Sequence, residues 1–591
     1  MTMTSLNDLA TEILLIVLNK VPSTKDLMNL RLVSRHLDSV TGPALFHSLA
    51  LDIRETSIQQ GTSLIQYLAE NPEAPIAGWV RILVIANLNP SYNGHMSGIL
   101  KGKPKDVIDV KTQIFNHLER AIQALGNVID VQWILTSREP KWTHTIIPKA
   151  LSTLPNLSSL SLNMFHATLS NPLPFDNLSG LRFLSVRSSF SRIENMWRNI
   201  LDPLVTATRN SQGQLEKLHL DIYAGKEIVQ LGELLRKWNH IPNEGVESSR
   251  IPGSSSDRSS SLGIRHLILG RANASLSSDV LPHLRLLTNV EMREQTTDHI
   301  PIDPSLSNDF FSTLRLATYP IHLSKISIYT VDKTLLDYLV SYSGLESFKV
   351  SSCPSPERVT ARTSGLVADG YDANRLARLF YRSVLPNHSQ SLTELELTVS
   401  KESAWSFCWE HVDKFRMCTK LQRLVVGINP NEIGNVGEKE DIVTTLLTTT
   451  LMLQDLYFLS ILITQSNSGE RSTLSSAAIT NKHVLQTKLY EIVGQTRHRV
   501  RVNGDIFTIL DLQRGASTQT TMLPRYARRV QCPGHIFDFV KTMCTMEMAD
   551  SRESSNANEQ GNDKDDEVEI LEFSYKEILS PVRSTNYSMI L

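Results

Sequence analysis

The sequence predicts an α/β protein in which an N-terminal helical module precedes a long, irregular solenoid with a parallel sheet. Two observations predict this architecture. The first is an apolar run at residues 13–18 that leads through a proline-containing turn into a second stretch with helical spacing. The second is a short pattern of aliphatic residues that recurs, at irregular intervals, through most of the remaining chain.

The N-terminal module takes its character from six consecutive apolar residues, Ile13 to Leu18. At 100° per residue, a helix over this run is apolar on every side and requires burial all round. A module of about 40 residues cannot supply that burial alone. The run is therefore expected either to pack on the rest of its own chain or to offer one face to a partner.

The segment that follows has clear helix signals. Ser23 is the predicted N-cap, and Asp26 stands three residues on, where a carboxylate meets free backbone amides. Apolar residues then recur at spacings of three and four, which predicts one helix that ends at Gly42-Pro43. The apolar stripe consists of Leu27, Leu30, Val33, Leu37 and Val40.

The order of residues in this module resembles the F-box, the motif by which receptors dock onto the Skp-type adaptor of cullin-RING (SCF) ubiquitin ligases. The matching residues are Leu9, Glu12, Ile13, Asp26, Leu27, Leu30, Val33, Ser34, Arg35 and Leu37. Residues 45–49 resemble the end of the motif in fungal members, and Ala10 stands where the family has proline. The resemblance implies that the adaptor is bound by Leu9, Glu12, Ile13, Val17, Leu27, Leu30, Val33, Ser34 and Leu37.

The body of the chain repeats a leucine-rich pattern: Leu, two polar residues, an aliphatic residue or Phe, one polar residue, and a second aliphatic residue or Phe. Chance gives about one match in a chain of this length, and the sequence has six. They begin at Leu157, Leu215, Leu287, Leu323, Leu345 and Leu392, and looser versions begin at Val80, Val128, Leu181, Ile264, Leu421 and Leu453. Residues 107–125 and 193–208, between such patterns, have helical spacing.

Alternation of strand and helix predicts a right-handed solenoid unit that must stack on its neighbours to bury its apolar edge. The pattern resembles the degenerate leucine-rich repeats of fungal F-box proteins, and the resemblance implies a horseshoe. A non-repeat α/β domain with parallel strands is the alternative. We expect the F-box-like module at residues 1–54, the solenoid at 75–465, a flexible Ser/Gly-rich insertion at 244–261, a C-terminal cap at 478–545, an acidic disordered linker at 549–569 and a tail at 570–591.

Strand alternation also predicts a binding face. If the leucines point inward, the third and fifth residues of each pattern, and the residue after it, point to the concave side. The candidate cargo-binding residues on that side are Lys217, His219, Lys325, Tyr329 and Lys349. The three lysines come from different repeats and predict a basic stripe for an acidic or phosphorylated segment. A solvated face without a ligand is the alternative.

Composition and motifs give little reason to expect an enzyme. The net charge of −2 over 591 residues predicts no binding of nucleic acid or of membranes. Five cysteines without a C-x-x-C pair indicate neither a disulfide framework nor structural zinc, and they favour a cytoplasmic or nuclear location. Metalloprotease, hydrolase-elbow and phosphate-loop motifs do not occur in the sequence. Cys408 and Cys418 lie near His411, the residue types of a thiol nucleophile or metal site, but no fourth ligand stands near them.

Together these features predict the substrate-recognition subunit of an SCF-type ubiquitin ligase. Such a subunit docks the Skp-type adaptor, and through it cullin, and holds an unknown protein cargo on its repeats. It makes no bond itself and needs no catalytic residue, metal or cofactor. One alternative is an interaction scaffold with no role in ubiquitin transfer. A weaker alternative is an α/β enzyme whose site lies on loops that carry no known motif.

Overall fold

The computed structural model describes residues 9–18, 21, 23–53, 58–89, 104–137, 139–165, 169–189, 193–211, 214–223, 229–239, 261–270, 274–293, 305–353, 373–399, 403–429, 442–456, 458–463, 499–502, 505–508, 536–540 and 571–573. The chain divides into two compact units. The first comprises residues 1–321 and 587–591, and the second comprises residues 322–586.

The first unit begins with three short helices: α1 (Thr11–Leu18), α2 (Thr24–Arg31) and α3 (Arg35–Leu45). Ser23 is the N-cap of α2, as predicted, because its hydroxyl accepts a hydrogen bond from the Asp26 amide at 3.2 Å. Ser34 caps α3 in the same way, accepting from the Leu37 amide at 3.1 Å. The prediction of one continuous helix is therefore wrong, since the second cap starts a new helix after a turn at residues 32–33.

The three helices enclose a small core of their own. Leu14 and Leu18 of α1 are buried against Leu37 and Val40 of α3. The predicted helix end at Gly42-Pro43 is also wrong, because both residues lie inside α3 and the Phe46 amide still bonds to the Gly42 carbonyl at 2.9 Å. A Cβ at position 42 would come within 2.5 Å of the Trp79 ring, so glycine permits this close approach.

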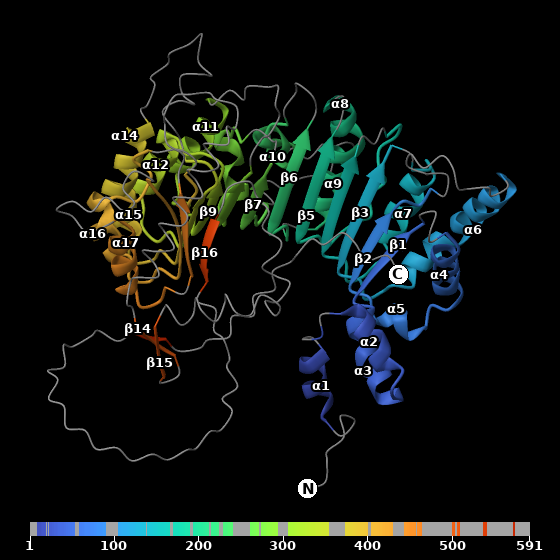
Figure 1. Ribbon diagram of the computed structural model, residues 1–591. Coiled ribbons are helices and arrows are strands. Elements are labelled where there is room, and N and C mark those ends of the chain that lie inside the picture. Colours follow the sequence, from blue (N-terminus) through green and yellow to red (C-terminus); the bar gives the residue numbers. More distant parts are fainter. Residues whose placement is uncertain are drawn as a thin grey trace, which may run out of the picture. The chain divides into compact units, whose positions relative to one another are not determined.

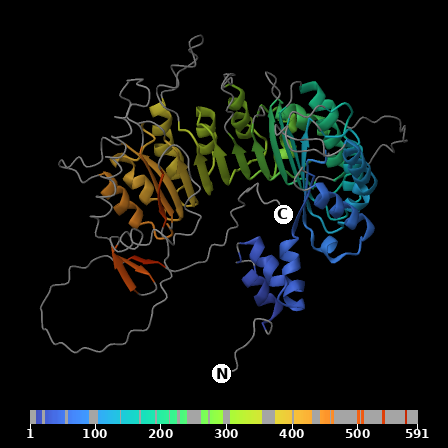
Figure 2. The ribbon, with the colours of Figure 1, turned by 45° about the vertical axis from the view of Figure 1, so that its right-hand side comes forward.

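The sheet of the first unit is parallel, and its strands follow one another in chain order (Figure 1). The helices that connect the strands lie along one face of this sheet (Figure 2). Among the described residues the strands are β1 (Ser48–Asp52), β2 (Ile82–Ala86), β3 (Asp130–Thr136), β4 (Ser159–Phe165), β5 (Phe183–Ser189), β6 (Lys217–Tyr223), β7 (His266–Leu269) and β8 (Asn289–Met292).

The helices of the first unit that follow the module are α4 (Ile58–Glu70), α5 (Pro75–Trp79), α6 (Pro104–Gln123), α7 (Thr143–Leu151), α8 (Ile193–Met196), α9 (Asp202–Asn210), α10 (Leu231–Asn239) and α11 (Ser305–Arg315). A π-helical stretch, Trp197–Leu201, joins α8 to α9, and a 3₁₀ stretch, Ser278–Leu284, precedes β8. The helices expected at residues 107–125 and 193–208 are thus confirmed.

The second unit repeats this construction. Its parallel strands, again in chain order, are β9 (Lys325–Ile328), β10 (Ser347–Val350), β11 (Glu394–Leu397), β12 (Arg423–Ile428) and β13 (Phe458–Ile463). Its helices are α12 (Lys333–Val340), α14 (Ala373–Leu379), α15 (Leu385–His388), α16 (Val412–Arg416) and α17 (Ile442–Leu451), with a π-helical stretch at Phe380–Val384 and a 3₁₀ stretch at Trp409–His411.

Residues of the expected C-terminal cap and tail add four strands to the second unit. β16 (Ile536–Val540) pairs antiparallel with β13, and β14 (Arg499–Val502) pairs with β15 (Asp505–Thr508) and β17 (Leu571–Phe573). The acidic linker expected at 549–569 lies outside the described residues, as does the insertion at 244–261 apart from Ser261.

The leucine-rich pattern locates the strands. All six strict matches coincide with β4, β6, β8, β9, β10 and β11, and residues such as Leu218, Ile326 and Leu395 are at most 1% exposed. Met292 is only half-buried. The α/β class with parallel sheets is therefore confirmed.

Two details of the repeat assignment are wrong. The last pattern begins at Leu456 rather than Leu453, because Leu459 and not Leu456 pairs with Leu424 of the neighbouring strand. The sheet also starts earlier than predicted, since β1 pairs with β2 and residues 48–52 therefore belong to the sheet instead of the helical module. Phe46 occupies the first position of that pattern, where the repeat has leucine.

Candidate binding surfaces

One face of α1 carries exposed aliphatic side chains. Leu14 and Leu18 point into the core of the module, while Ile13, Ile16 and Val17 are 49%, 62% and 43% exposed. At 100° per residue these three lie together on the side of the helix away from that core. We call them the α1 face. Three branched aliphatic side chains in contact with water on so short a helix mark a surface that favours a partner.

The residues expected to bind the adaptor divide into three groups. Glu12, Ile13, Val17 and Val33 are exposed. Leu9, Leu27 and Leu30 are partly buried and pack on the core of the module. Leu37 is buried inside that core, and the Ser34 hydroxyl caps α3, so these two stabilise the module rather than form its surface.

The resemblance to the F-box did not single out three exposed aliphatic residues. Ile16 belongs to the α1 face, Leu15 of the same helix is 37% exposed, and Leu32 lies in the turn after α2, where it is 83% exposed. Their exposure follows from the break between α2 and α3 and from the position of α1 on its core.

The sheet of the first unit has one face that is turned away from the helices, which we call the open face. Lys217 and His219 of β6 lie on this face. His219 lies beside Ser185 of β5 and Ile268 of β7, and all three are buried. The Ser185 hydroxyl is 3.0 Å from His219 Nδ1, and Nε2 is buried without a hydrogen-bond partner among the described residues. Burial, and then the positive charges around it, lower the pKa of His219 to about 3, so its imidazole is neutral.

Charged side chains surround that imidazole. Those that lower its pKa are Arg187, Arg293 and Lys217, together with His266. Arg293 forms an ion pair with Glu291 at 2.7 Å, and the Lys217 ammonium lies 5.0 Å from the centre of the Phe183 ring.

The open face of the second unit differs from the expected basic stripe. Lys349 Nζ lies 2.9 Å from Glu394 and 3.5 Å from Glu396, and Arg423 reaches Glu396 at 2.5 Å. Burial by itself lowers the pKa of Lys349, but the hydrogen bond to Glu394 and the two carboxylates outweigh it and raise that pKa. Lys349 thus offers no unpaired positive charge. Lys325 is exposed and Tyr329 is half-buried on the same face.

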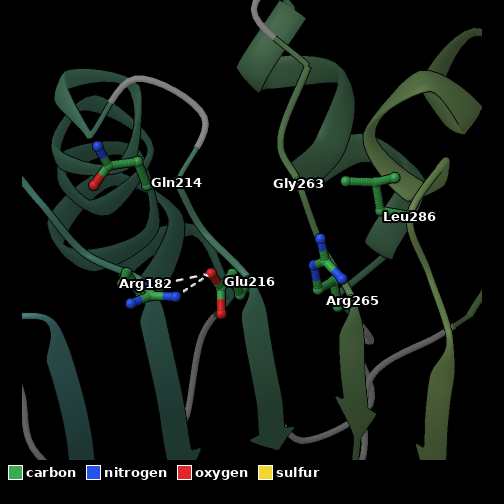
Figure 3. Close-up of a pocket in the computed structure, with 6 residues that line it drawn as sticks. All are labelled: Arg182, Gln214, Glu216, Gly263, Arg265 and Leu286. Atoms are coloured by element: carbon green, nitrogen blue, oxygen red, sulfur yellow. Dashed lines mark hydrogen bonds and ion pairs between the residues drawn. The ribbon is translucent and has the colours of Figure 1, made fainter.

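A shallow cavity of about 450 Å³ lies at the edge of the first unit's sheet where β5 to β8 begin (Figure 3). It is lined by Arg182, Gln214, Glu216, Gly263, Arg265 and Leu286. The carboxylate in this lining belongs to Glu216, and it forms an ion pair with Arg182 (Figure 3). The cavity therefore presents no nucleophile and no free general base, and it does not resemble a catalytic site.

The cysteine–histidine group singled out in the sequence is part of the packing of the second unit. Cys408 Sγ lies 3.4 Å from His411 Nδ1, and the His411 ring stacks on Tyr381 with centroids 3.5 Å apart. Burial lowers the pKa of His411 to about 4 and raises that of Cys418 to about 12. Across the described residues, no group of three or more His, Cys, Asp or Glu side chains is placed to hold a metal ion.

Within the part of the chain that the structure describes, no helix combines the length and the apolar character needed to cross a bilayer. The longest, α6, carries charged residues along its exposed side. No protein-family model matches the sequence, and no curated protein matches it either.

Proposed function

We propose that this chain is the substrate-recognition subunit of an SCF-type ubiquitin ligase, in which α1, α2 and α3 act as an F-box and the strand–helix units act as leucine-rich repeats in a horseshoe. The α1 face is the observation that carries the proposal. Its three aliphatic side chains are held in contact with water by a helix whose opposite side is fixed in a core. In the family that the sequence resembles, this helix docks onto the Skp-type adaptor.

The size of the α1 face suits a protein contact. Complete burial of one Val or Ile side chain contributes about 1.5–3 kcal/mol, and about half of each side chain remains exposed. Covering Ile13, Ile16 and Val17 therefore contributes roughly 3 kcal/mol before any polar contact is counted. This contribution is large enough for the loss of the α1 face to weaken binding by two orders of magnitude.

The rest of the chain fits the task of holding cargo. Each unit contains a parallel sheet with helices that supply its core, which leaves a polar strand face for a protein partner. Such a receptor makes no bond itself. It acts by holding cargo near the ubiquitin-charged conjugating enzyme, which raises the effective concentration of the reacting groups.

The first test is adaptor binding by the full-length chain. Ile13→Asp combined with Val17→Asp places two charges on the α1 face, and a buried unpaired charge costs several kcal/mol. We expect purified Skp-type adaptor to bind the double variant at least a hundredfold more weakly than wild type. Ile108→Asp is the matched control, because Ile108 is an isoleucine of α6 that is 63% exposed. Equal adaptor binding by the double variant and the control would reject the proposal.

A second measurement separates a ubiquitin-ligase receptor from an interaction scaffold. The wild-type chain and the double variant are purified from cells with and without proteasome inhibition, and the ubiquitination of co-purifying proteins is compared. A receptor requires that at least one partner be ubiquitinated and accumulate with wild type, but not with the double variant. Partners that bind both forms equally and are never ubiquitinated would instead establish a scaffold.

A further inference from the structure

The open face of the first unit has a buried patch with two polar side chains, which we call the floor. Ser185, His219 and Ile268 are direct neighbours in the register of β5, β6 and β7. All three are at most 4% exposed, although they project from the face opposite the leucine core. Arg187 and Lys217 lie in the flanking rows of the register, two residues from Ser185 and His219, and therefore belong to the same face of the sheet.

The imidazole of His219 has a hydrogen-bond partner for only one of its two nitrogens among the described residues. When the Ser185 hydroxyl donates to Nδ1, Nε2 carries the proton and is a donor. That nitrogen is buried and has no partner in the described part of the chain. A buried donor without an acceptor is rare in native proteins. Here it points to an acceptor that binds from outside.

The charges around the floor select the acceptor. Arg187, Lys217 and Arg293 contribute three positive charges from β5, β6 and the end of β8, while Asp221 and Glu291 contribute two negative charges. His219 is neutral, so among these described side chains one positive charge remains in excess.

Among the described cations around the floor, Arg187 is the one available to a ligand. Its neighbour in the register is Asp221, but the Asp221 carboxylate lies over Gly270, in space that a Cβ at position 270 would occupy. Arg187 accordingly forms no ion pair with any described residue.

We propose that this floor binds the carboxylate of an acidic side chain in the protein segment that the receptor captures. The inference rests on the proposed function and specifies its cargo. One carboxylate oxygen accepts from His219 Nε2–H, and the Arg187 guanidinium, with its fork of donors, faces the other. A singly charged anion neutralises the remaining positive charge. A phosphate, with a charge near −2, would face the Asp221 carboxylate with one negative charge in excess.

The test begins with a random-peptide display on the immobilised full-length chain. We expect peptides with Asp or Glu at one fixed position to be enriched by wild type and by the control Arg198→Gln, which removes an exposed arginine from the π-helical stretch of the same unit. Arg187→Gln should abolish this enrichment, because Arg187 is exposed and its loss leaves the buried floor intact. His219→Gln is a second variant, and the thermal unfolding transition of each variant reports whether its fold is intact.

The enriched peptide is then synthesised with Glu, Gln or phosphoserine at the selected position. The inference requires the Glu peptide to bind tenfold to a hundredfold more tightly than the Gln peptide, and more tightly than the phosphoserine peptide. Tighter binding of phosphoserine would overturn the assignment to a carboxylate. Acid enrichment that persists in both variants would place the site elsewhere. Acid selection by a chain that binds no adaptor would leave this site standing and reject the proposed function.

Discussion

Glu139 carries a buried carboxyl group whose ionisation should set the stability of the first unit. It is only 8% exposed, its Oε1 accepts from the Leu88 amide at 3.2 Å, and its Oε2 is buried without a partner in the described residues. Burial raises its pKa to about 7, with a smaller contribution from the Asp52 carboxylate, and the Leu88 hydrogen bond opposes the rise.

The raised pKa fixes the sign of the pH dependence. Between pH 4.5 and about 7 the folded chain holds a proton on Glu139 that the unfolded chain has released. Stability from this group is therefore present in full below pH 4.5 and is lost as the pH rises through about 7. The difference between 4.5 and about 7 corresponds to roughly 3 kcal/mol in the free energy of unfolding, at about 1.36 kcal/mol per pKa unit.

Glu139→Gln removes this loss, because the amide cannot ionise and its carbonyl can still accept from the Leu88 amide. We expect the variant to match wild type at pH 4.5 and to be more stable by about 2–3 kcal/mol at pH 8. Hydrogen exchange of peptides from β2 and β3 measures this difference locally, and comparison at equal pH cancels intrinsic exchange rates. Glu233→Gln, in an exposed position of α10, should change nothing. Equal protection of the Glu139→Gln variant and wild type at pH 8 would refute the reasoning.

Two further substitutions test the packing of the first unit. A Cβ at Gly61 of α4 would lie 2.8 Å from the Asp52 carbonyl oxygen, so Gly61→Ala should lower stability by about 1–3 kcal/mol despite the better helix propensity of alanine. A thermal unfolding temperature at or above that of wild type would contradict this expectation and would show that the backbone near Asp52 moves to accommodate the added Cβ. Ser34→Ala removes the cap of α3 and should cost about 1 kcal/mol, seen as faster amide exchange at residues 35–38, whereas unchanged exchange would show that the cap is dispensable.

The strands were predictable because their signal is local and repeated. Each strict pattern has its apolar residues at fixed offsets, and burial of those residues in the described structure leaves little room for another register. The same local signal explains why the last repeat was misplaced. Leu453 and Leu456 are both buried, and either residue fits the first position of the leucine-rich pattern. β1 was missed because Phe46 replaces the leucine.

The helical module and the open faces were less predictable, because their details depend on contacts between distant residues. The apolar stripe from Leu27 to Val40 fits one helix as well as two, and only the Ser34 cap decides between them. The sequence alone predicts that Lys349 is a cation without an ion-pair partner. Its neutralisation depends on strand pairing that brings in Glu394 and Glu396, more than forty residues away.

We expect the two proposed surfaces of the first unit to recognise partners by different physical means. The α1 face is aliphatic, so it gains free energy from any complementary apolar surface and tolerates small changes in that surface. The floor around His219 is polar and buried, so a ligand without a matching acceptor leaves its donor unsatisfied at a cost of about 1–3 kcal/mol. Contacts of the first kind suit a constant partner such as an adaptor, and those of the second kind discriminate among cargoes. Substitution of Arg187 or His219 should accordingly change the choice of cargo, whereas substitution of Ile13, Ile16 or Val17 should weaken adaptor binding.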